Sequence, residues 1–174
     1  MGEVMLVRPN ETMLAEIAAY REAMLAAGSS LDGTSGLVNY DDPAAWLAHV
    51  RVMESEETCP AHLVTSTLYV AIRAGEQRIV GMIDLRHRLN EFLTECGGHI
   101  GYSVRPDERR KGYASQMLAM ALEKAKARGL ERVLVTCDDD NIASARTIER
   151  NGGIWENTIQ KDGEAIRRYW INIA

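Results

Sequence analysis

A short basic turn holds the residues of this sequence that are best suited to binding a ligand. It reads Arg-Arg-Lys-Gly at positions 109–112 and lies between an apolar run, residues 100–104, and a long amphipathic segment. Pro106 separates the run from the turn, because proline has no N–H to give to a strand ladder. The first turn of a helix has unpaired N–H groups and a partial positive charge, and Gly112 leaves that backbone open to an anion. The sequence therefore predicts an anion site; a helix start with a solvated basic turn is the alternative.

The segment after the turn has the pattern of one long helix that packs by a single face. Gly129 stands where such a helix would end in a left-handed residue. The turn itself matches neither G-x-G-x-x-G nor G-x-x-x-x-G-K-[ST], so it is not typical of a dinucleotide or nucleoside triphosphate site. The apolar residues of the packed face recur at spacings of three and four. They are Ala114, Met117, Leu118, Ala121, Leu122 and Ala125.

The pattern Arg109-x-x-Gly112-x-Ala114, behind a strand and before a long helix, resembles the pyrophosphate motif of the GNAT superfamily of N-acetyltransferases. A second match follows after one intervening strand. Residues 141–144, Asn-Ile-Ala-Ser, open the next predicted helix, and residues 149–153 close it. They resemble the family's second conserved region, in which an Asn at the helix start contacts the pantetheine arm of acetyl-CoA.

The resemblance implies an α/β fold in a single domain, residues 1–174. Its sheet would be mixed and mostly antiparallel, with six or seven strands flanked by about four helices, and the fourth and fifth strands would be parallel and splayed. Acetyl-CoA, the co-substrate, would place its pantetheine arm in the splay and its pyrophosphate on the turn, and no metal is required. The residues implied to bind it are Tyr102, Ser103, Val104, Arg109, Arg110, Lys111, Gly112, Tyr113, Ala114, Ser115, Asn141 and Ser144.

Local patterns predict the remaining elements. One helix is expected from Asn10 to about Ala27, with Leu14, Ile17, Met24 and Leu25 on its inner face. A second begins at Asp42-Pro43, a capping side chain followed by proline at the first helical position. The predicted strands are residues 4–8, 66–73, 78–86, 99–104, 131–137, 154–160 and 166–173.

The implied activity is transfer of an acetyl group from acetyl-CoA to a primary amine by direct attack. A backbone N–H near Val104 would stabilise the charge that develops on the carbonyl oxygen. An alkylamine, with a pKa near ~10.4, must lose a proton before it attacks. His99 and His87 are the predicted bases, because imidazole titrates near neutral pH, and Tyr102 is the third catalytic candidate. Strand alternation puts His99 and Tyr102 on opposite faces, so only one of them faces the cleft unless a bulge shifts the register.

One position departs from the family pattern. Many relatives carry a Tyr seven residues after the helix-opening Asn, as the acid toward the CoA sulfur, and Ile148 stands there in this sequence. The role would be unfilled, or carried by Ser144, Tyr169 or water. Two alternatives therefore stay open: an acetyl-CoA-binding sensor or remnant without efficient catalysis, and a phosphate-binding interaction module unrelated to CoA.

Two polar segments are candidates for binding the acceptor. Arg86, His87 and Asn90 follow a predicted strand and could bind a carboxylate or phosphate, or could belong to a solvated connection. Residues 138–140, Asp-Asp-Asp, end the fifth strand; they would attract a cationic amine, or would cap the following helix. The acceptor itself stays open.

The composition of the 174 residues excludes some classes of protein. A net charge of −5 argues against nucleic-acid binding, and no apolar run approaches the length of a membrane span. Three scattered cysteines, Cys59, Cys96 and Cys137, indicate a reducing compartment, so a cytoplasmic protein is expected. A homodimer is a mild preference from the resemblance.

Overall fold

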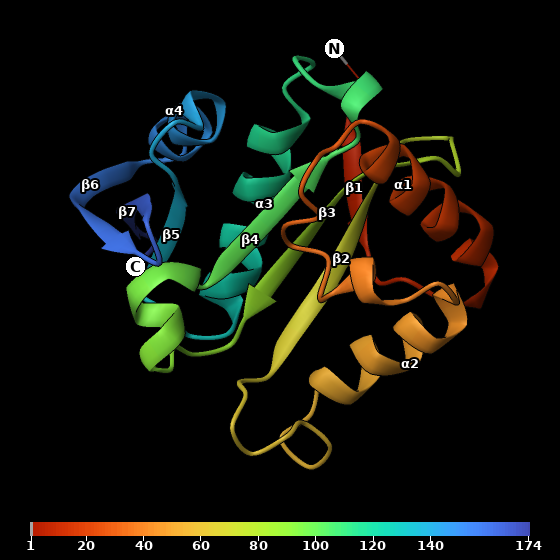
Figure 1. The fold of residues 1–174 in the computed structure, drawn as a ribbon, viewed down its shortest axis with the longest axis horizontal. Coiled ribbons are helices and arrows are strands. Elements are labelled where there is room, and N and C mark those ends of the chain that lie inside the picture. Colours follow the sequence, from red (N-terminus) through yellow and green to blue (C-terminus); the bar gives the residue numbers. More distant parts are fainter. Residues whose placement is uncertain (1) are drawn as a thin grey trace.

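One seven-stranded sheet runs through the computed structural model, which describes residues 2–174 (Figure 1). The strand order is β1-β2-β3-β4-β5-β7-β6. Neighbouring strands are antiparallel except for β4 and β5, which are parallel. The strands are β1 (Val4–Val7), β2 (Ser66–Arg73), β3 (Ile79–Arg86), β4 (Ile100–Val104), β5 (Arg132–Asp138), β6 (Gly153–Lys161) and β7 (Glu164–Asn172).

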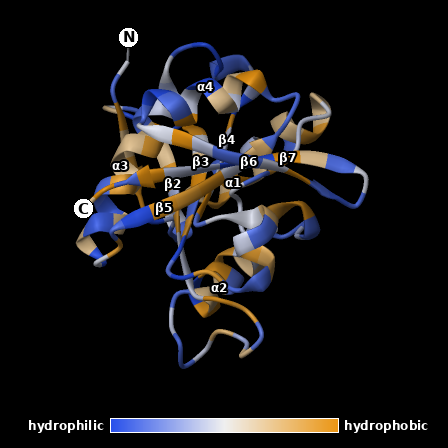
Figure 2. Cartoon of the chain, turned by 90° about the vertical axis from the view of Figure 1, so that its left-hand side faces the viewer, coloured by the Kyte–Doolittle hydropathy of each residue, from blue (hydrophilic) through white to orange (hydrophobic). Residues whose placement is uncertain are grey.

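Four α-helices cover the two faces of the sheet. They are α1 (Leu14–Ala26), α2 (Pro43–Met53), α3 (Tyr113–Ala127) and α4 (Ile142–Arg150). One core contains the buried residues of α3 and α4, and a second core on the other face contains those of α1 and α2. Figure 2 shows α3 and α4 on one side of the sheet and α2 on the other.

Local sequence signals account for the helices on both faces. The Asp42 side chain accepts a hydrogen bond from the Ala44 N–H and Pro43 occupies the first helical position, as predicted for α2. In α3 the predicted apolar face is buried from Met117 to Ala125. A 3₁₀ turn with Asn10 as its cap precedes α1, so the helix proper begins at Leu14.

The fold prediction is confirmed, with local corrections. The sheet has seven strands, and the parallel pair is the predicted one. Leu25 was predicted on the inner face of α1 but is 41% exposed, whereas Tyr20 is fully buried. The buried residues Ile17, Tyr20 and Met24 are spaced by three and four, and Leu25 lies one residue further round the helix. The first strand ends at Val7, one residue earlier than predicted.

The parallel strands β4 and β5 separate soon after they meet. Their ladder consists of one residue pair, Ile100 with Val135. By contrast, β3 pairs with β4 along its whole length, from Leu85–Ile100 to Gly81–Val104. Towards their C-terminal ends the facing edges of β4 and β5 therefore have no strand between them, which is the predicted splay. Among residues 2–174, none of the helices has both the length and the apolar character that crossing a bilayer requires.

Candidate cofactor and acceptor site

The basic turn leaves the start of α3 open. Gly112 is the N-cap, in a left-handed conformation (φ 80°), and within residues 2–174 no side chain caps the helix. The first bond of the helix runs from the Gln116 N–H to the Gly112 carbonyl at 3.2 Å. The N–H groups before Gln116 are therefore free for an anion, and the helix dipole favours negative charge there. This geometry fits a pyrophosphate group.

The three basic side chains of the turn have different surroundings. Arg109 donates through Nε to the Val104 carbonyl at 3.1 Å and through Nη2 to Ser29 Oγ at 2.9 Å. Lys111 Nζ lies 2.7 Å from Glu108 Oε2. Arg110 is exposed, adopts φ 63°, and makes no hydrogen bond or ion pair with the rest of the described chain. The sequence predicted three charges around the anion: in the described chain Lys111 is paired with a carboxylate, Arg109 is held by two uncharged oxygens, and Arg110 has neither kind of partner.

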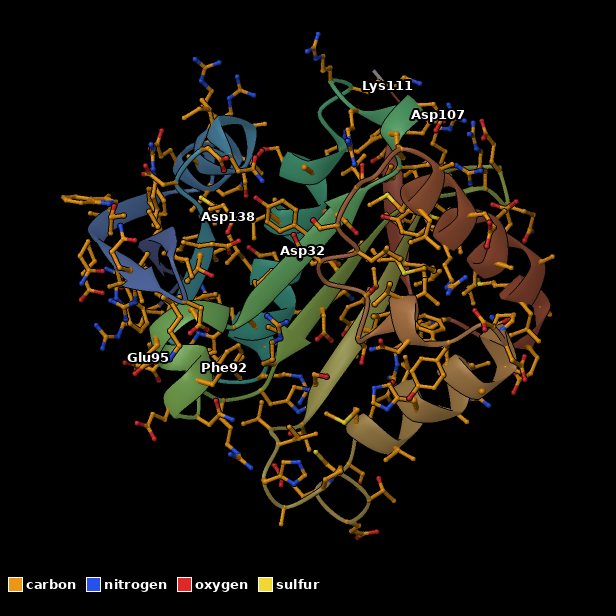
Figure 3. The ribbon with its side chains drawn as sticks, in the orientation of Figure 1. Asp32, Phe92, Glu95, Asp107, Lys111 and Asp138 are labelled. Carbon is orange, nitrogen blue, oxygen red and sulfur yellow. The ribbon has the colours of Figure 1, made fainter. Side chains whose placement is uncertain are left out.

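A buried carboxylate lies under the turn. Glu108 is 1% exposed. Besides Lys111, it contacts Arg78 at 2.9 Å and Arg73 at 3.2 Å. Three cations offset the cost of burying this charge, so Glu108 fixes the turn to Arg73 at the end of β2 and to Arg78 just before β3. Figure 3 labels Lys111 and Asp107 at this end of the molecule.

A pair of hydroxyls joins β4 to α4, the helix that follows β5, at the splay. The Tyr102 hydroxyl lies 2.7 Å from Ser144 Oγ. Both side chains are half-buried, and burial raises the pKa of Tyr102 to about 12. Ile148, one helical turn further along α4, is fully buried. Asn141 accepts from the Ser144 N–H at 3.1 Å, so its oxygen caps α4.

Ser103 faces the opposite side of the sheet from Tyr102. Its hydroxyl lies 2.9 Å from that of Tyr20 in the core beneath α1. Only the backbone of Ser103 can therefore meet a ligand in the splay. Two tyrosine–serine pairs thus lie on the two faces of β4, and one of them is fully enclosed.

His99 lies where the splay closes. Its Nδ1 accepts the Leu134 N–H at 2.9 Å, and the backbone N–H of His99 donates to the Leu134 carbonyl at 2.7 Å. The side chain is 5% exposed, and burial, with a smaller effect of Arg86, lowers the pKa of His99 to about 4. An imidazole whose Nδ1 lone pair is used and which resists protonation is a poor proton acceptor.

His87 lies beyond the closed end of the splay, because β3 pairs Leu85 with Ile100 and then continues away from Val104. Its two ring nitrogens are each 2.8 Å from a hydroxyl, Nδ1 from Thr65 and Nε2 from Thr67. Burial and the nearby Arg128 lower the pKa of His87 to about 4. The geometry favours a structural role for this ring.

The other two acceptor candidates are also engaged with their own chain. Arg86 donates to the Gly97 carbonyl at 3.2 Å and lies 3.3 Å from Asp84 Oδ2. Asn90 accepts the Leu93 N–H at 2.9 Å and lines a cavity of about 430 Å³ with Phe92 and Glu95. The predicted acceptor segment therefore does not converge on the open end of the splay.

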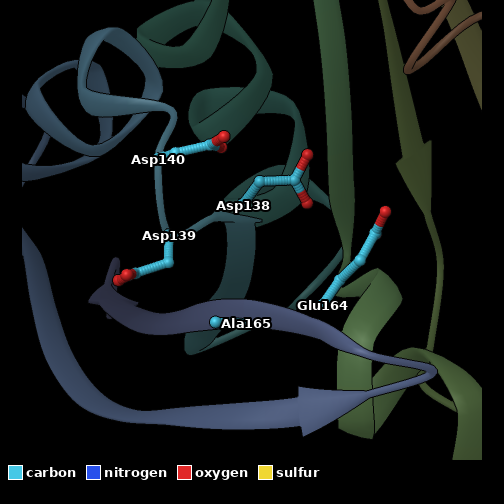
Figure 4. A pocket seen from close by; sticks show the side chains of 5 residues that line it. All are labelled: Asp138, Asp139, Asp140, Glu164 and Ala165. Carbon is cyan, nitrogen blue, oxygen red and sulfur yellow. The ribbon is translucent and has the colours of Figure 1, made fainter.

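An acidic cavity does lie at the open end. It measures about 300 Å³ and is lined by residues 138–140 together with Glu164 and Ala165. In Figure 4 the carboxyl groups of Asp138, Asp140 and Glu164 point into one space and that of Asp139 points away. Asp139 accepts from Arg167 at 2.7 Å.

Asp32 is a further acidic residue of this cavity region. Burial raises the pKa of Asp138, and the charges of Glu164, Asp32 and Asp140 raise it further. Asp32 lies beside Asp138 in the view of Figure 3. Sequence reasoning found residues 138–140 but missed Asp32 and Glu164, because nothing local marks residues that only the tertiary fold brings together.

The comparisons with known proteins identify the family of the chain. A model of the acetyltransferase (GNAT) family matches residues 33–153. The chain belongs to this family. It is 29% identical over 110 residues to an uncharacterized N-acetyltransferase, YnaD, of Bacillus subtilis (strain 168). That match spans 60% of this chain and 62% of the length of YnaD.

Solved acetyltransferases share the whole fold of this GNAT chain. One is the microcin C7 self-immunity acetyltransferase MccE in complex with acetyl-CoA and AMP, at a TM-score of 0.72 and 15% identity. The alignment covers 98% of this chain and 93% of MccE. Another is the ribosomal-protein-S5-alanine acetyltransferase of Vibrio fischeri, at a TM-score of 0.72 and 18% identity, covering 97% of this chain and 91% of that one. At these identities the likeness concerns the fold.

Proposed function

We propose that residues 1–174 act as one acetyltransferase domain, which moves an acetyl group from acetyl-CoA to a primary amine by direct attack. The observation that carries this proposal is the open start of α3 beside the splay of β4 and β5. A ligand that combines a pyrophosphate with a long, thin arm fits this pair of features. Family membership and the acetyl-CoA in the MccE structure support the same cofactor.

In this proposal the turn and the splay hold the co-substrate. The N–H groups of residues 110–115 would bind the pyrophosphate, and the free edge of β4 from Tyr102 to Val104 would hold the pantetheine arm. When bound, acetyl-CoA supplies an activated thioester. The chain itself contributes orientation, and a β4 N–H near Val104 would donate to the carbonyl oxygen as charge develops there.

The acceptor in this proposal is a cationic amine. The uncompensated carboxylates of Asp32, Asp138 and Glu164 support this class, because they would draw an ammonium group to the open end of the splay. The ammonium must then lose a proton. Neither His87 nor His99 is well placed for this step, so water in the acidic cavity is the more suitable route for the proton.

Two further parts of the proposal concern the protein as a whole. The three cysteines are free thiols, which supports a cytoplasmic location.

Ile154 and Trp155 on the edge strand β6 are 70% and 56% exposed, which supports a homodimer formed through this edge.

The test is thiol release from acetyl-CoA against a panel of amines, with binding of CoA followed separately by thermal shift. We expect Gly112→Glu to abolish the thermal shift, because it places a negative side chain at the left-handed position where the pyrophosphate would lie. The loss of one or two charge-assisted hydrogen bonds, at ~1.5–3 kcal/mol each, predicts at least tenfold weaker binding.

Three outcomes separate the candidate functions. Release of thiol with any amine, lost in Gly112→Glu, supports the acetyltransferase. Binding of CoA without turnover on any amine supports the sensor or remnant. A folded Gly112→Glu variant that binds CoA as tightly as the parent would show that the turn is not the cofactor site.

A further inference from the structure

The leaving sulfur of a thioester gains from a hydrogen-bond donor as its bond to carbon breaks. No such donor comes from position 148, because Ile148 of α4 is apolar and fully buried in the core that α4 forms with α3 and the sheet. Tyr169 does not supply one either, since its hydroxyl lies 3.2 Å from Glu149 Oε1. This inference rests on the proposed acetyl-transfer function and concerns which group meets the sulfur.

The hydroxyls of Tyr102 and Ser144 are placed where that donor is needed. Tyr102 belongs to the free edge region of β4 and Ser144 to the first turn of α4, so their 2.7 Å contact crosses the splay itself. Ser144 precedes Ile148 by four residues and therefore shares its face of the helix. Both side chains remain partly accessible, unlike the enclosed Tyr20–Ser103 pair.

A hydroxyl pair of this kind has one proton to spare. One O–H is used between the two oxygens, and the other can be donated to a third atom. Besides Ser144 Oγ, the Tyr102 hydroxyl has only a long contact of 3.4 Å to the Ser144 carbonyl among the described residues, which a better acceptor would replace. The thiol of Cys137, at the end of β5, is near Ser144: burial raises the pKa of this thiol to about 11, against smaller lowering effects of the Arg167 charge and of the Ser144 hydroxyl. A sulfur atom can therefore sit beside these oxygens.

We infer that Tyr102, paired with Ser144 across the splay, donates a hydrogen bond to the sulfur of acetyl-CoA as the carbon–sulfur bond breaks. The amine nitrogen forms the new bond to the carbonyl carbon, and the electron pair of the carbon–sulfur bond goes to sulfur. The proton that the amine loses passes to solvent, and the CoA thiolate takes a proton from solvent after it leaves.

Tyr102 keeps its own proton throughout this step. Its pKa of about 12 lies far above the ~8.5 of an ordinary thiol, so transfer from phenol to thiolate is unfavourable. A neutral phenol is a strong donor to a charged acceptor. The consequence is a lower pKa for the thiol of bound CoA, a property that can be measured without turnover.

The experiment is a pH titration of thiolate absorbance for CoA bound to the parent and to Tyr102→Phe, taken as the difference from the ligand-free protein. We expect the pKa of the bound thiol to rise by about one unit in the variant, since one charge-assisted hydrogen bond is lost. With an acceptor in hand, kcat should fall by about 10- to 100-fold, with the Kd for acetyl-CoA changed less than about threefold.

Tyr20→Phe is the matched control. It removes the same atom from the same kind of tyrosine–serine pair, on the opposite face of β4, and should leave the pKa of the bound thiol at the parent value. Ser144→Ala is the second variant; it breaks the pair but keeps the phenol, and we expect a smaller rise in the thiol pKa.

The outcomes are distinguishable. An unchanged thiol pKa in Tyr102→Phe, or in Ser144→Ala if the first variant fails to fold, overturns the inference and leaves the acetyltransferase proposal standing. An equal rise in Tyr20→Phe also overturns it, because the effect would then be structural. Failure of the parent to bind CoA would instead contradict the proposed function.

Discussion

At the scale of single residues, burial decides what the two candidate histidines can do. A base near neutral pH needs a free lone pair and a pKa close to that pH. His99 gives its Nδ1 lone pair to Leu134, and His87 is held between Thr65 and Thr67. With the pKa of each lowered to about 4, both rings stay neutral near pH 7, and their hydrogen bonds stabilise the sheet and its connections.

His99→Asn tests this interpretation, because the asparagine oxygen can accept the Leu134 N–H in place of Nδ1. We expect kcat/KM to fall less than about threefold and the acidic limb of its pH profile to remain; a catalytic base would cost ~10²-fold or more and take the limb with it. The stability of the parent should be complete above about pH 6.5 and fall towards pH 4, because the unfolded chain binds the proton first.

The comparison of melting temperatures across that window isolates His99. The fall between pH 6.5 and 4 should be smaller in His99→Asn than in the parent. An equal fall would mean that the ring is not held neutral in the folded state. His87→Gln provides the parallel measurement for the second ring.

Burial shifts the pKa of the Asp84 carboxyl group in the opposite direction from that of the two histidines. It lies opposite Gly101 in the β3–β4 ladder and is 4% exposed, and its Oδ1 has no hydrogen-bond partner within the described chain. Burial raises its pKa, against smaller effects of Arg86 and of a hydrogen bond with Ser66. The carboxyl group is thus shielded from solvent on the face that carries α1 and α2.

At the scale of elements, the turn before α3 combines one rigid side with one open side. Glu108 and Lys111 belong to the rigid side, where four charged groups are packed together. Arg110 belongs to the open side and holds a left-handed conformation that favours glycine. Strained conformations of this kind cluster at functional sites, which agrees with the proposed role of the turn in binding the co-substrate.

Two single-charge substitutions separate these sides. Arg110→Gly relieves the left-handed conformation, so the ligand-free protein should be unchanged or more stable by up to ~1 kcal/mol, while CoA binds about 3- to 10-fold more weakly. Lys111→Met should lower the melting temperature, because it opens the Glu108 cluster, and should affect Kd less. Isothermal titration with CoA and thermal unfolding of the same samples give both quantities.

The reverse result would contradict this division of the turn. If Lys111→Met weakens CoA binding more than Arg110→Gly does, Lys111 is the phosphate ligand and leaves Glu108 when CoA binds. Repeating the titration with dephospho-CoA shows whether Arg110 meets the 3′-phosphate or the pyrophosphate, since only CoA carries the former.

The elements themselves could be predicted from the sequence because their signals are local. Periodicity gave the buried face of α3, Asp42 and Pro43 gave the start of α2, and Gly112 marked the turn. The burial of Glu108 could not be predicted, because its partners are distant in sequence: Arg73 ends β2 and Arg78 lies just before β3. Likewise no local pattern predicts that Nδ1 of His99 accepts the N–H of Leu134, 35 residues away.

At the scale of the whole molecule, opposite charges lie at the open end of the splay, one beyond β4 and the other beyond β5. The turn before α3 presents the free cation of Arg110, and the cavity at the ends of β5 and β7 presents Asp138, Asp140 and Glu164. The net charge of −5 hides this separation. An anionic co-substrate and a cationic acceptor would therefore be drawn to different places around one strand opening.

Asp138→Asn tests whether the acidic cavity receives the acceptor, and Asp139→Asn is its control. Both variants change the net charge equally, but Asp138 faces the cavity and Asp139 is paired with Arg167. We expect Asp138→Asn to raise the KM for a diamine about 5- to 20-fold, as for the loss of one partly exposed charge contact, with the KM for acetyl-CoA unchanged.

Added salt should raise the parent's KM for the diamine and affect Asp138→Asn less, because the screened interaction is already absent. The KM for the diamine should also rise as the pH falls through the raised pKa of Asp138, since protonation removes the attracting charge. Equal effects of the two variants would mean that only the overall field matters, and an unchanged KM in both would place the acceptor elsewhere.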